Sequence, residues 1–341
     1  MPRVGILTGG GDCPGLNAVI SAVVRKSLHE HLEVVGIMRG WAGMIENDTV
    51  KLDRKAVSGI LHRGGTILRT SRANPFKKEE DAMKVVENFK KMGLNALIAV
   101  GGDDTLGVAF KLHQRGIPVV GVPKTIDNDL SGTDVTFGFD TAVNIAMEAI
   151  DRLHTTAESH NRVMVVELMG REAGWITFVA GVAGGADLVL IPEIPMGIEE
   201  ICSYIVNRHK EGKSFSIVAV AEGFSLGKGV VTQSAELDSF GHPKLGGIGN
   251  FLGKEIEVRT GFETRVTVLG HVQRGGSPTA SDRFLGVEFG VKAVELVLAK
   301  DFGKMVSKRG NEIMAIPLAD AVSRHRLVDS KSYALAKIFF G

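Results

Sequence analysis

The fold class is decided by residues 96–122, which read ALIAVGGDDTLGVAFKLHQRGIPVVGV. This stretch begins with a short apolar run, passes through a glycine-rich turn into a longer amphipathic segment, and ends in a second apolar run. Two short buried strands joined by a helix are typical of a parallel sheet, because parallel strands need a long crossover connection. The stretch therefore predicts one strand–helix–strand unit of an α/β protein.

The same alternation extends along the whole chain. The predicted strands are 3–8, 32–38, 96–100, 118–122, 162–168, 187–193, 215–221, 264–270 and 313–317. The predicted helices are 16–30, 79–92, 105–115, 140–158, 198–211 and 279–299. So many strands indicate two sheets. Residues 224–250 are rich in glycine and polar residues and lack periodicity, so we expect a surface excursion there.

The composition is that of a globular protein of enzyme size. The chain has 341 residues, of which 44% are hydrophobic, and this length favours two domains. With 40 Lys and Arg against 39 Asp and Glu, the net charge of +1 argues against nucleic acid or an anionic membrane as a partner. Cys13 and Cys202 form no disulfide framework, no apolar run reaches a membrane-spanning length, and the N-terminus does not read as a signal peptide. We therefore expect a cytoplasmic protein.

Two glycine-rich loops follow predicted strands, at the sheet edge where open α/β sheets bind ligands. The first, residues 9–15, reads GGGDCPG and has a backbone able to approach a phosphate, although such a turn is as often merely tight. The second, GGDDT at 101–105, places Asp103 and Asp104 at the start of a helix. One of these carboxylates could cap the helix, or hold Mg²⁺ together with phosphate oxygens, and both roles are compatible.

The most informative loop is PKTIDNDL at 123–130, which delivers Lys124, Thr125, Asp127 and Asp129 from the end of a buried strand. A lone Asp-Asn-Asp run is more often a solvated turn than a catalytic site. Beside a second acidic loop, however, these residues supply a metal site, a cation and a carboxylate base, which phosphoryl transfer needs. A fourth segment, MGR at 169–171, adds another cation at the same edge.

Five ordered motifs together resemble the phosphofructokinase family: GGD, GGDxT, PxTIDND, MGR, and ETRVTVLGHVQRGG at 263–276. The resemblance spans nearly the whole chain. It implies two Rossmann-like αβα three-layer domains with mostly parallel sheets and an active site in the cleft between them. The larger, donor-binding domain would comprise residues 1–138 and 273–305, and the smaller, fructose-6-phosphate-binding domain residues 139–272 and 306–341.

The resemblance also assigns roles in the transfer of a phosphoryl group to fructose 6-phosphate. Asp127 would be the general base, with Thr125 beside it, and Asp103 the Mg²⁺ ligand. Arg72 and Arg171 would neutralise the phosphoryl group in flight. On the donor side the family's motifs match Gly11, Asp104, Thr105 and Lys124. On the sugar side they match Asp129, Met169, Gly170 and Glu222, and the 6-phosphate would be held by Arg162, Arg265, His271 and Arg274.

Two of these phosphate ligands usually come from a neighbouring subunit, so the resemblance implies a homodimer or homotetramer with shared active sites. Taken alone, each of these phosphate ligands could instead have a purely structural role. The arginines could form surface ion pairs, and His271 could be a satisfied buried imidazole.

The donor is expected to be pyrophosphate rather than ATP. ATP-using members of the family carry a second glycine after GGD, where this chain has Asp104. Its negative charge would oppose the α-phosphate of ATP by roughly 4 kcal/mol at an effective dielectric constant of about 20. Lys124 would contact pyrophosphate oxygens or pair with Asp104, although it also occurs in some ATP-using members. The products would be fructose 1,6-bisphosphate and phosphate in a reversible reaction.

Other classes remain as alternatives. An ATP-dependent phosphofructokinase would share every motif and differ only at the position of Asp104. An NAD kinase has a similar GGD loop, but it does not explain the motif at 263–276. A dinucleotide-dependent oxidoreductase would need the glycine fingerprint that residues 9–15 lack. A non-catalytic sugar-phosphate sensor would have no need of Asp127.

Overall fold

The structure is a computed structural model that describes residues 1–227, 233–237, 243–245 and 247–340. The chain divides into two compact units. Unit 1 consists of Met1–Ile126, Leu130–Thr141 and Arg274–Arg324. Unit 2 consists of Asp127–Asp129, Ala142–Gln273 and the chain from His325 onward.

Within the described residues, unit 1 holds a seven-stranded sheet in the order β13-β12-β5-β4-β1-β2-β3. The five central strands run parallel, and the two edge strands, β3 and β13, pair antiparallel with their neighbours. The strands are β1 (Arg3–Thr8), β2 (Glu33–Ile37), β3 (Thr49–Leu52), β4 (Ala96–Gly101), β5 (Val119–Pro123), β12 (Lys304–Arg309) and β13 (Glu312–Pro317).

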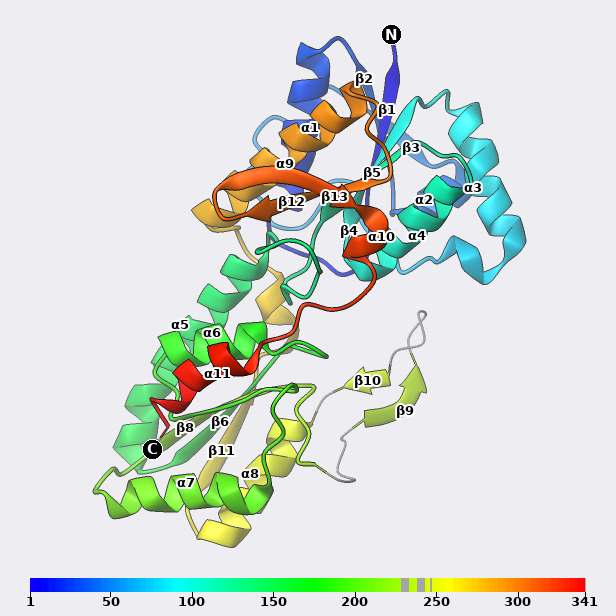
Figure 1. Ribbon diagram of the computed structural model, residues 1–341. Helices are drawn as coiled ribbons and strands as arrows, with labels where there is room; N and C mark the ends of the chain where they lie inside the picture. Colours follow the sequence, from blue (N-terminus) through cyan, green and yellow to red (C-terminus); the bar gives the residue numbers. More distant parts are fainter. Residues whose placement is uncertain (228–232, 238–242, 246, 341) are drawn as a thin grey trace. The chain divides into compact units, whose positions relative to one another are not determined.

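Helices cover both faces of this sheet. On one face α1 (Leu16–His29) and α9 (Ala280–Leu298) pack against each other, as Figure 1 shows. The other face carries α2 (Trp41–Glu46), α3 (Glu79–Lys91), α4 (Asp103–Gln114) and α10 (Leu318–Ala321). These four helices share one hydrophobic core with the apolar side chains of β1, β4 and β5. The 3-10 turn η1 (Pro75–Lys77) precedes α3.

Unit 2 is built around a parallel sheet in the order β11-β6-β8-β7. Its strands are β6 (Val163–Leu168), β7 (Leu188–Leu190), β8 (Ser216–Ala221) and β11 (Thr264–Val268). One face packs its core against α7 (Ile198–Lys210) and α8 (Ile248–Thr260). The other face carries α5 (Phe139–His160), α6 (Trp175–Ala183) and α11 (Ser330–Lys337) (Figure 1). The 3-10 turn η2 (Gly270–Arg274) follows β11, and β9 (Gln233–Leu237) pairs antiparallel with β10 (Pro243–Leu245).

The predicted α/β class with mostly parallel sheets is confirmed. All nine predicted strands are present, although the one expected at 187–193 shortens to Leu188–Leu190. The predicted helix at 79–92 is α3, which has three acidic residues in its first turn and two lysines in its last, as the helix dipole favours. No helix among the described residues is long and apolar enough to cross a bilayer.

The domain boundary near the C-terminus differs from the prediction, which placed residues 306–341 in the smaller domain. Residues 306–324 belong to unit 1, because β12 pairs with β5 and β13 pairs with β12. The sequence Lys304–Arg309, KMVSKR, did not read as a strand, since two of its alternate positions carry charges. Of the predicted excursion 224–250, residues 228–232, 238–242 and 246 lie outside the described residues, and 248–250 begin α8.

Candidate active site

Three of the four predicted loops lie side by side at one edge of the sheet of unit 1. They follow β1, β4 and β5, which are neighbouring parallel strands, so their carboxyl ends meet at that edge. Backbone bonds join the loops: the Gly9 N–H donates to the Val100 carbonyl at 2.9 Å, and the Lys124 N–H donates to the Gly101 carbonyl at 3.0 Å. The loops chosen because ligands bind at the carboxyl ends of parallel strands therefore lie next to one another in the structure.

Glycines make this cluster possible because side chains occupy the space where a β-carbon would stand. A β-carbon on Gly9 would lie 2.6 Å from Oγ1 of Thr105, and one on Gly11 would lie 2.6 Å from Nη1 of Arg274. Gly10 adopts a φ of 80°, which glycine tolerates best. The first loop is therefore a close-packed backbone turn that Thr105 and Arg274 contact directly.

Lys124 is buried inside this cluster, with 3% of its surface exposed. Its amino group donates to the carbonyl oxygen of Gly11 at 2.7 Å. Burial lowers the pKa of Lys124, because the charged form loses its hydration, and the same burial raises the pKa of the Cys13 thiol. The sequence predicted a contact of Lys124 with donor oxygens or with Asp104; the structure places its ammonium group at the backbone of the first loop.

The two carboxylates of the second loop stand in the first turn of α4. Gly102, not an aspartate, is the N-cap residue, and a glycine has no side chain that could accept a capping hydrogen bond. The expectation that Asp103 or Asp104 caps the helix is therefore wrong. Both side chains are partly exposed at the positive end of the helix dipole, which favours negative charge. Among the described residues, no group of three or more His, Cys, Asp and Glu side chains is arranged to hold a metal.

Arg72 follows a segment that is tied to the first loop of unit 1. The Thr70 hydroxyl donates to the Gly10 carbonyl at 2.6 Å, and the Thr8 hydroxyl donates to the Arg69 carbonyl at 2.9 Å. These bonds fix the backbone leading to Arg72 beside the predicted donor loop.

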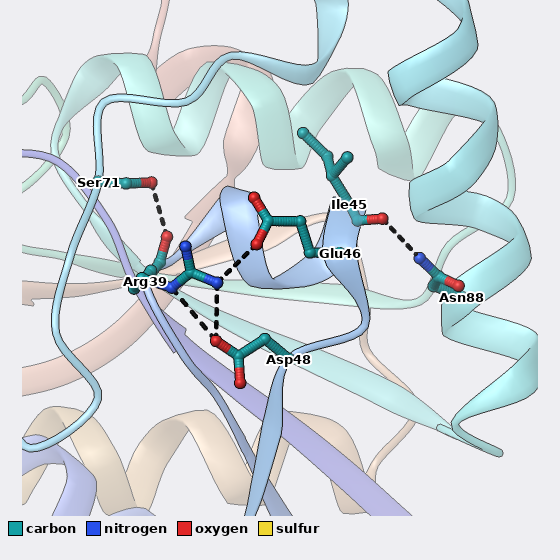
Figure 2. Close-up of polar contacts among 6 residues, drawn as sticks. All are labelled: Arg39, Ile45, Glu46, Asp48, Ser71 and Asn88. Atoms are coloured by element: carbon teal, nitrogen blue, oxygen red, sulfur yellow. Dashed lines mark hydrogen bonds and ion pairs between the residues drawn. The ribbon is translucent and has the colours of Figure 1, made fainter.

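Figure 2 shows how the neighbour of Arg72 is anchored on the other side. The Ser71 hydroxyl donates to the Arg39 carbonyl at 2.6 Å. The guanidinium of Arg39 in turn contacts Glu46 at 2.6 Å and Asp48 at 2.8 Å. Nearby, the Asn88 amide donates to the carbonyl of Ile45 at 2.9 Å and so ties α3 to α2.

In unit 2, the predicted sugar-binding residues gather at the carboxyl ends of β6 and β8, which pair in parallel. The Glu222 N–H donates to the Leu168 carbonyl at 2.8 Å, and the Gly170 N–H points to Oε1 of Glu222 at 3.5 Å. Gly170 has a φ of 142°, and Met169 is 8% exposed. The Met169 N–H also approaches Oε1 of Gln273 at 3.4 Å, a contact that the sequence analysis did not anticipate. Met169, Gly170 and Glu222 thus form one local cluster.

Arg171 lies just beyond this cluster, where the segment that follows β6 packs closely against the segment that follows β8. A β-carbon on Gly223 would lie 1.8 Å from the Arg171 carbonyl oxygen, so this close approach requires glycine at position 223. Asp127 and Asp129 also belong to unit 2, and the N–H of Arg326 donates to the Asp129 carbonyl at 2.7 Å. Sequence reasoning missed Arg326, because it lies about 200 positions further along the chain and carries no motif.

The predicted phosphate ligands come from three different places in the chain, around β6 and β11, on η2, and in unit 1. Arg162 lies just before β6, and Arg265 lies on β11. Both form ion pairs with Glu263, Arg162 at 2.8 Å. These ion pairs lower the pKa of Glu263. His271 is exposed on η2, so the alternative of a buried imidazole is wrong. Arg274 belongs to unit 1, where its Nη1 donates to the Asp12 carbonyl at 3.3 Å, beside the predicted donor loop.

Comparisons with known proteins agree with one another. The family model described as Phosphofructokinase matches residues 3–297. A pyrophosphate–fructose 6-phosphate 1-phosphotransferase of Streptomyces coelicolor is 55% identical over 99% of this chain and 100% of its own length. ATP-dependent 6-phosphofructokinase 3 of the same organism is 49% identical over 98% of this chain and 99% of its own. The solved phosphofructokinase of Saccharomyces cerevisiae superposes with a TM-score of 0.82 at 30% identity; the match covers 99% of this chain but 46% of the yeast chain.

Proposed function

Because this chain belongs to the phosphofructokinase family, we propose that it transfers a phosphoryl group from pyrophosphate to the 1-hydroxyl of fructose 6-phosphate. The products are fructose 1,6-bisphosphate and phosphate. The reaction runs in both directions, because the phosphoanhydride bond that is broken and the phosphate ester bond that is formed have similar free energies of hydrolysis. Four relatives that are 50–55% identical over nearly their whole length carry the name of this activity.

The observation that carries the choice of donor is Asp104 in the first turn of α4. The family resemblance places the nucleotide's α-phosphate at this position, where ATP-using members have glycine. A carboxylate there repels the additional phosphate of ATP and fills its space, whereas pyrophosphate ends before it. Lys124, buried next to the first loop, adds a positive charge for the shorter donor.

The roles on the donor side follow from the loop cluster of unit 1. Backbone N–H groups at Gly11 and the side chain of Thr105 contact the donor, and Arg72 neutralises the phosphoryl group in flight. Arg274, which lies beside the same loop, adds charge there or to the sugar phosphate. Asp103 is a partly exposed carboxylate at a helix start, and it suits Mg²⁺, which takes one or two protein carboxylates and completes its shell with water and phosphate oxygens. When bound, Mg²⁺ supplies neutralising charge to the phosphates.

The roles on the acceptor side belong to unit 2. Asp127 accepts the proton from the 1-hydroxyl as that oxygen attacks phosphorus, and Thr125 lies two residues before it. Asp129 orients the sugar together with the cluster at the ends of β6 and β8, which consists of Met169, Gly170 and Glu222. Arg171 follows that cluster and completes the neutralisation of the transferred group.

We also propose that the working form is a homodimer or homotetramer whose subunits share the 6-phosphate site. Arg265 lies on β11, the edge strand of its sheet, Arg162 lies just before the neighbouring strand β6, and His271 lies on η2, which follows β11. The edge is exposed and partly apolar, with 51% of Val268 and 60% of Val272 accessible. A second copy covering this edge would bring phosphate ligands to the sugar. The buried free thiols of Cys13 and Cys202 suit the reducing cytoplasm.

The deciding experiment compares steady-state rates with pyrophosphate and with ATP on the purified protein. Turnover with pyrophosphate at least tenfold above that with ATP supports the proposal. The second candidate is an ATP-dependent 6-phosphofructokinase, favoured by relatives of that name at 49% identity. Brisk turnover with ATP and none with pyrophosphate would establish that alternative.

A further inference from the structure

A segment near the C-terminus crosses the loop that carries the proposed base. We call residues 325–328 the C-terminal strap. The Arg326 N–H donates to the Asp129 carbonyl at 2.7 Å, and Nη1 of Arg326 donates to the Asn128 carbonyl at 3.3 Å. The strap is therefore bonded directly to the backbone of Asp127–Asp129, and all of these residues belong to unit 2.

The strap is also fixed to the segment that follows β6. The indole N–H of Trp175 donates to the Arg326 carbonyl at 2.9 Å, and the Arg326 guanidinium lies 4.2 Å from the centroid of the Trp175 ring. The Glu193 carboxylate joins the two segments, because it accepts from the N–H groups of Gly174 and Val328, both at 2.9 Å. The strap thus sets the position of one loop of the acceptor side relative to another.

His325, the first residue of the strap, places its imidazole between two carboxylates. Its Nε2 lies 3.1 Å from Oε2 of Glu172, and its Nδ1 lies 3.7 Å from Oδ2 of Asp129. The ring therefore lies between the two carboxylates, within hydrogen-bond distance of Glu172 and slightly farther from Asp129. Without it, two negative charges would face each other across the space that the ring fills.

We propose that His325 is a positioning residue, which acts through Asp129 to fix the sugar-binding geometry of the acceptor side. The inference rests on the proposed function, in which Asp129 contacts fructose 6-phosphate. Asn128, next to Asp129, has a φ of 53°, a left-handed conformation that asparagine adopts more readily than most residues but that still benefits from a restraint by its surroundings. The strap provides that restraint on the backbone, and His325 provides it for the Asp129 side chain.

This role predicts an effect mainly on one substrate. The bonds described join the strap to Asn128 and Asp129, the part of the loop that belongs to unit 2, and not to Lys124 earlier on the same loop, so its loss should act mainly on sugar binding and change pyrophosphate binding much less. A general loss of stability would instead weaken the binding of both substrates or lower the amount of folded enzyme. The ratio of the two KM values therefore separates a positioning role from a merely structural one.

The test uses the full chain with His325→Ala and His325→Gln, and with Arg324→Gln as a matched control. Arg324 is the exposed neighbour of His325. For each variant we would measure Tm, the Kd of fructose 6-phosphate by calorimetry without donor, and KM for both substrates. We expect His325→Ala to raise Kd and KM for fructose 6-phosphate severalfold, up to about tenfold, because Asp129 and Glu172 would then face each other without the ring between them, with KM for pyrophosphate within about twofold. His325→Gln retains a donor and should recover part of the loss, while Arg324→Gln should resemble the wild type.

Wild-type affinity for fructose 6-phosphate in His325→Ala would overturn the inference, as would an equal rise in both KM values. The proposed function fails separately, if the wild-type enzyme does not turn over pyrophosphate. In that case the calorimetric Kd still judges His325, because it requires no donor.

Discussion

Removing the carboxylate of Asp104 should move the enzyme towards ATP. This side chain stands at the second position of α4, partly exposed at the helix start. Two like charges about 4 Å apart at an effective dielectric constant of about 20 repel by about 4 kcal/mol, roughly a thousandfold in binding. Water and salt at a partly exposed position screen much of this, so we expect Asp104→Gly to raise kcat/KM for ATP by about ten- to a hundredfold.

The assay compares kcat/KM for ATP and for pyrophosphate in the wild type, Asp104→Gly and Asp104→Asn. Asparagine keeps the volume and removes the charge, so a gain in both variants indicates repulsion, and a gain in the glycine variant alone indicates a clash. Glycine in a helix costs about 1 kcal/mol of stability. Glu80→Gly is the matched control, because Glu80 is exposed at the same helix position in α3. An unchanged ATP to pyrophosphate ratio in both Asp104 variants would refute the account of donor choice.

Three further predictions concern the base, the metal and pH. Asp127→Asn should lower kcat by about 10²- to 10⁴-fold while the calorimetric Kd of fructose 6-phosphate stays within a few fold, since only proton removal is lost; near-normal kcat would exclude Asp127 as the base. An excess of chelator should abolish turnover, restored by added Mg²⁺, but leave sugar binding intact, because arginines and not the metal hold the 6-phosphate; turnover in chelator would contradict a metal requirement. Burial raises the pKa of Asp282, despite hydrogen bonds from Thr141, so the folded state holds this proton where the unfolded chain releases it. That contribution to stability is present below the ordinary aspartate pKa and is lost as pH rises through the raised value. In urea unfolding, Asp282→Asn should therefore gain stability relative to the wild type as pH rises above the ordinary aspartate pKa; a constant difference would show that this carboxyl does not titrate as described.

Much of the fold was predictable because its central strands are fully buried. Val4–Thr8 and Ala96–Gly101 are apolar on both faces, so their sequence alone reads as parallel strands flanked by helices. The strand Lys304–Arg309 was missed, since it lies near the edge of the sheet and three of its six residues are charged. Its place depends on pairing with β5 and β13, which local sequence does not encode.

The candidate site likewise has features that the sequence predicts and features that it does not. The loops with Gly11, Asp103 and Lys124 were predictable, because strand ends and glycine patterns are local features. That α4 begins at Asp103, with Gly102 as its N-cap, was read only from the structure, because helix boundaries depend on backbone conformation that the sequence leaves open.

The sequence by itself determined the α/β class, the order of its loops and the residue types available for phosphoryl transfer, because strand burial and turn chemistry act over a few neighbouring residues. Only the tertiary structure decided that the strap at 325–328 holds Asp129, or that Lys124 is buried against the carbonyl of Gly11. Those contacts join residues separated by more than a hundred positions. Their formation depends on how whole sheets and helices pack, and no local pattern records it.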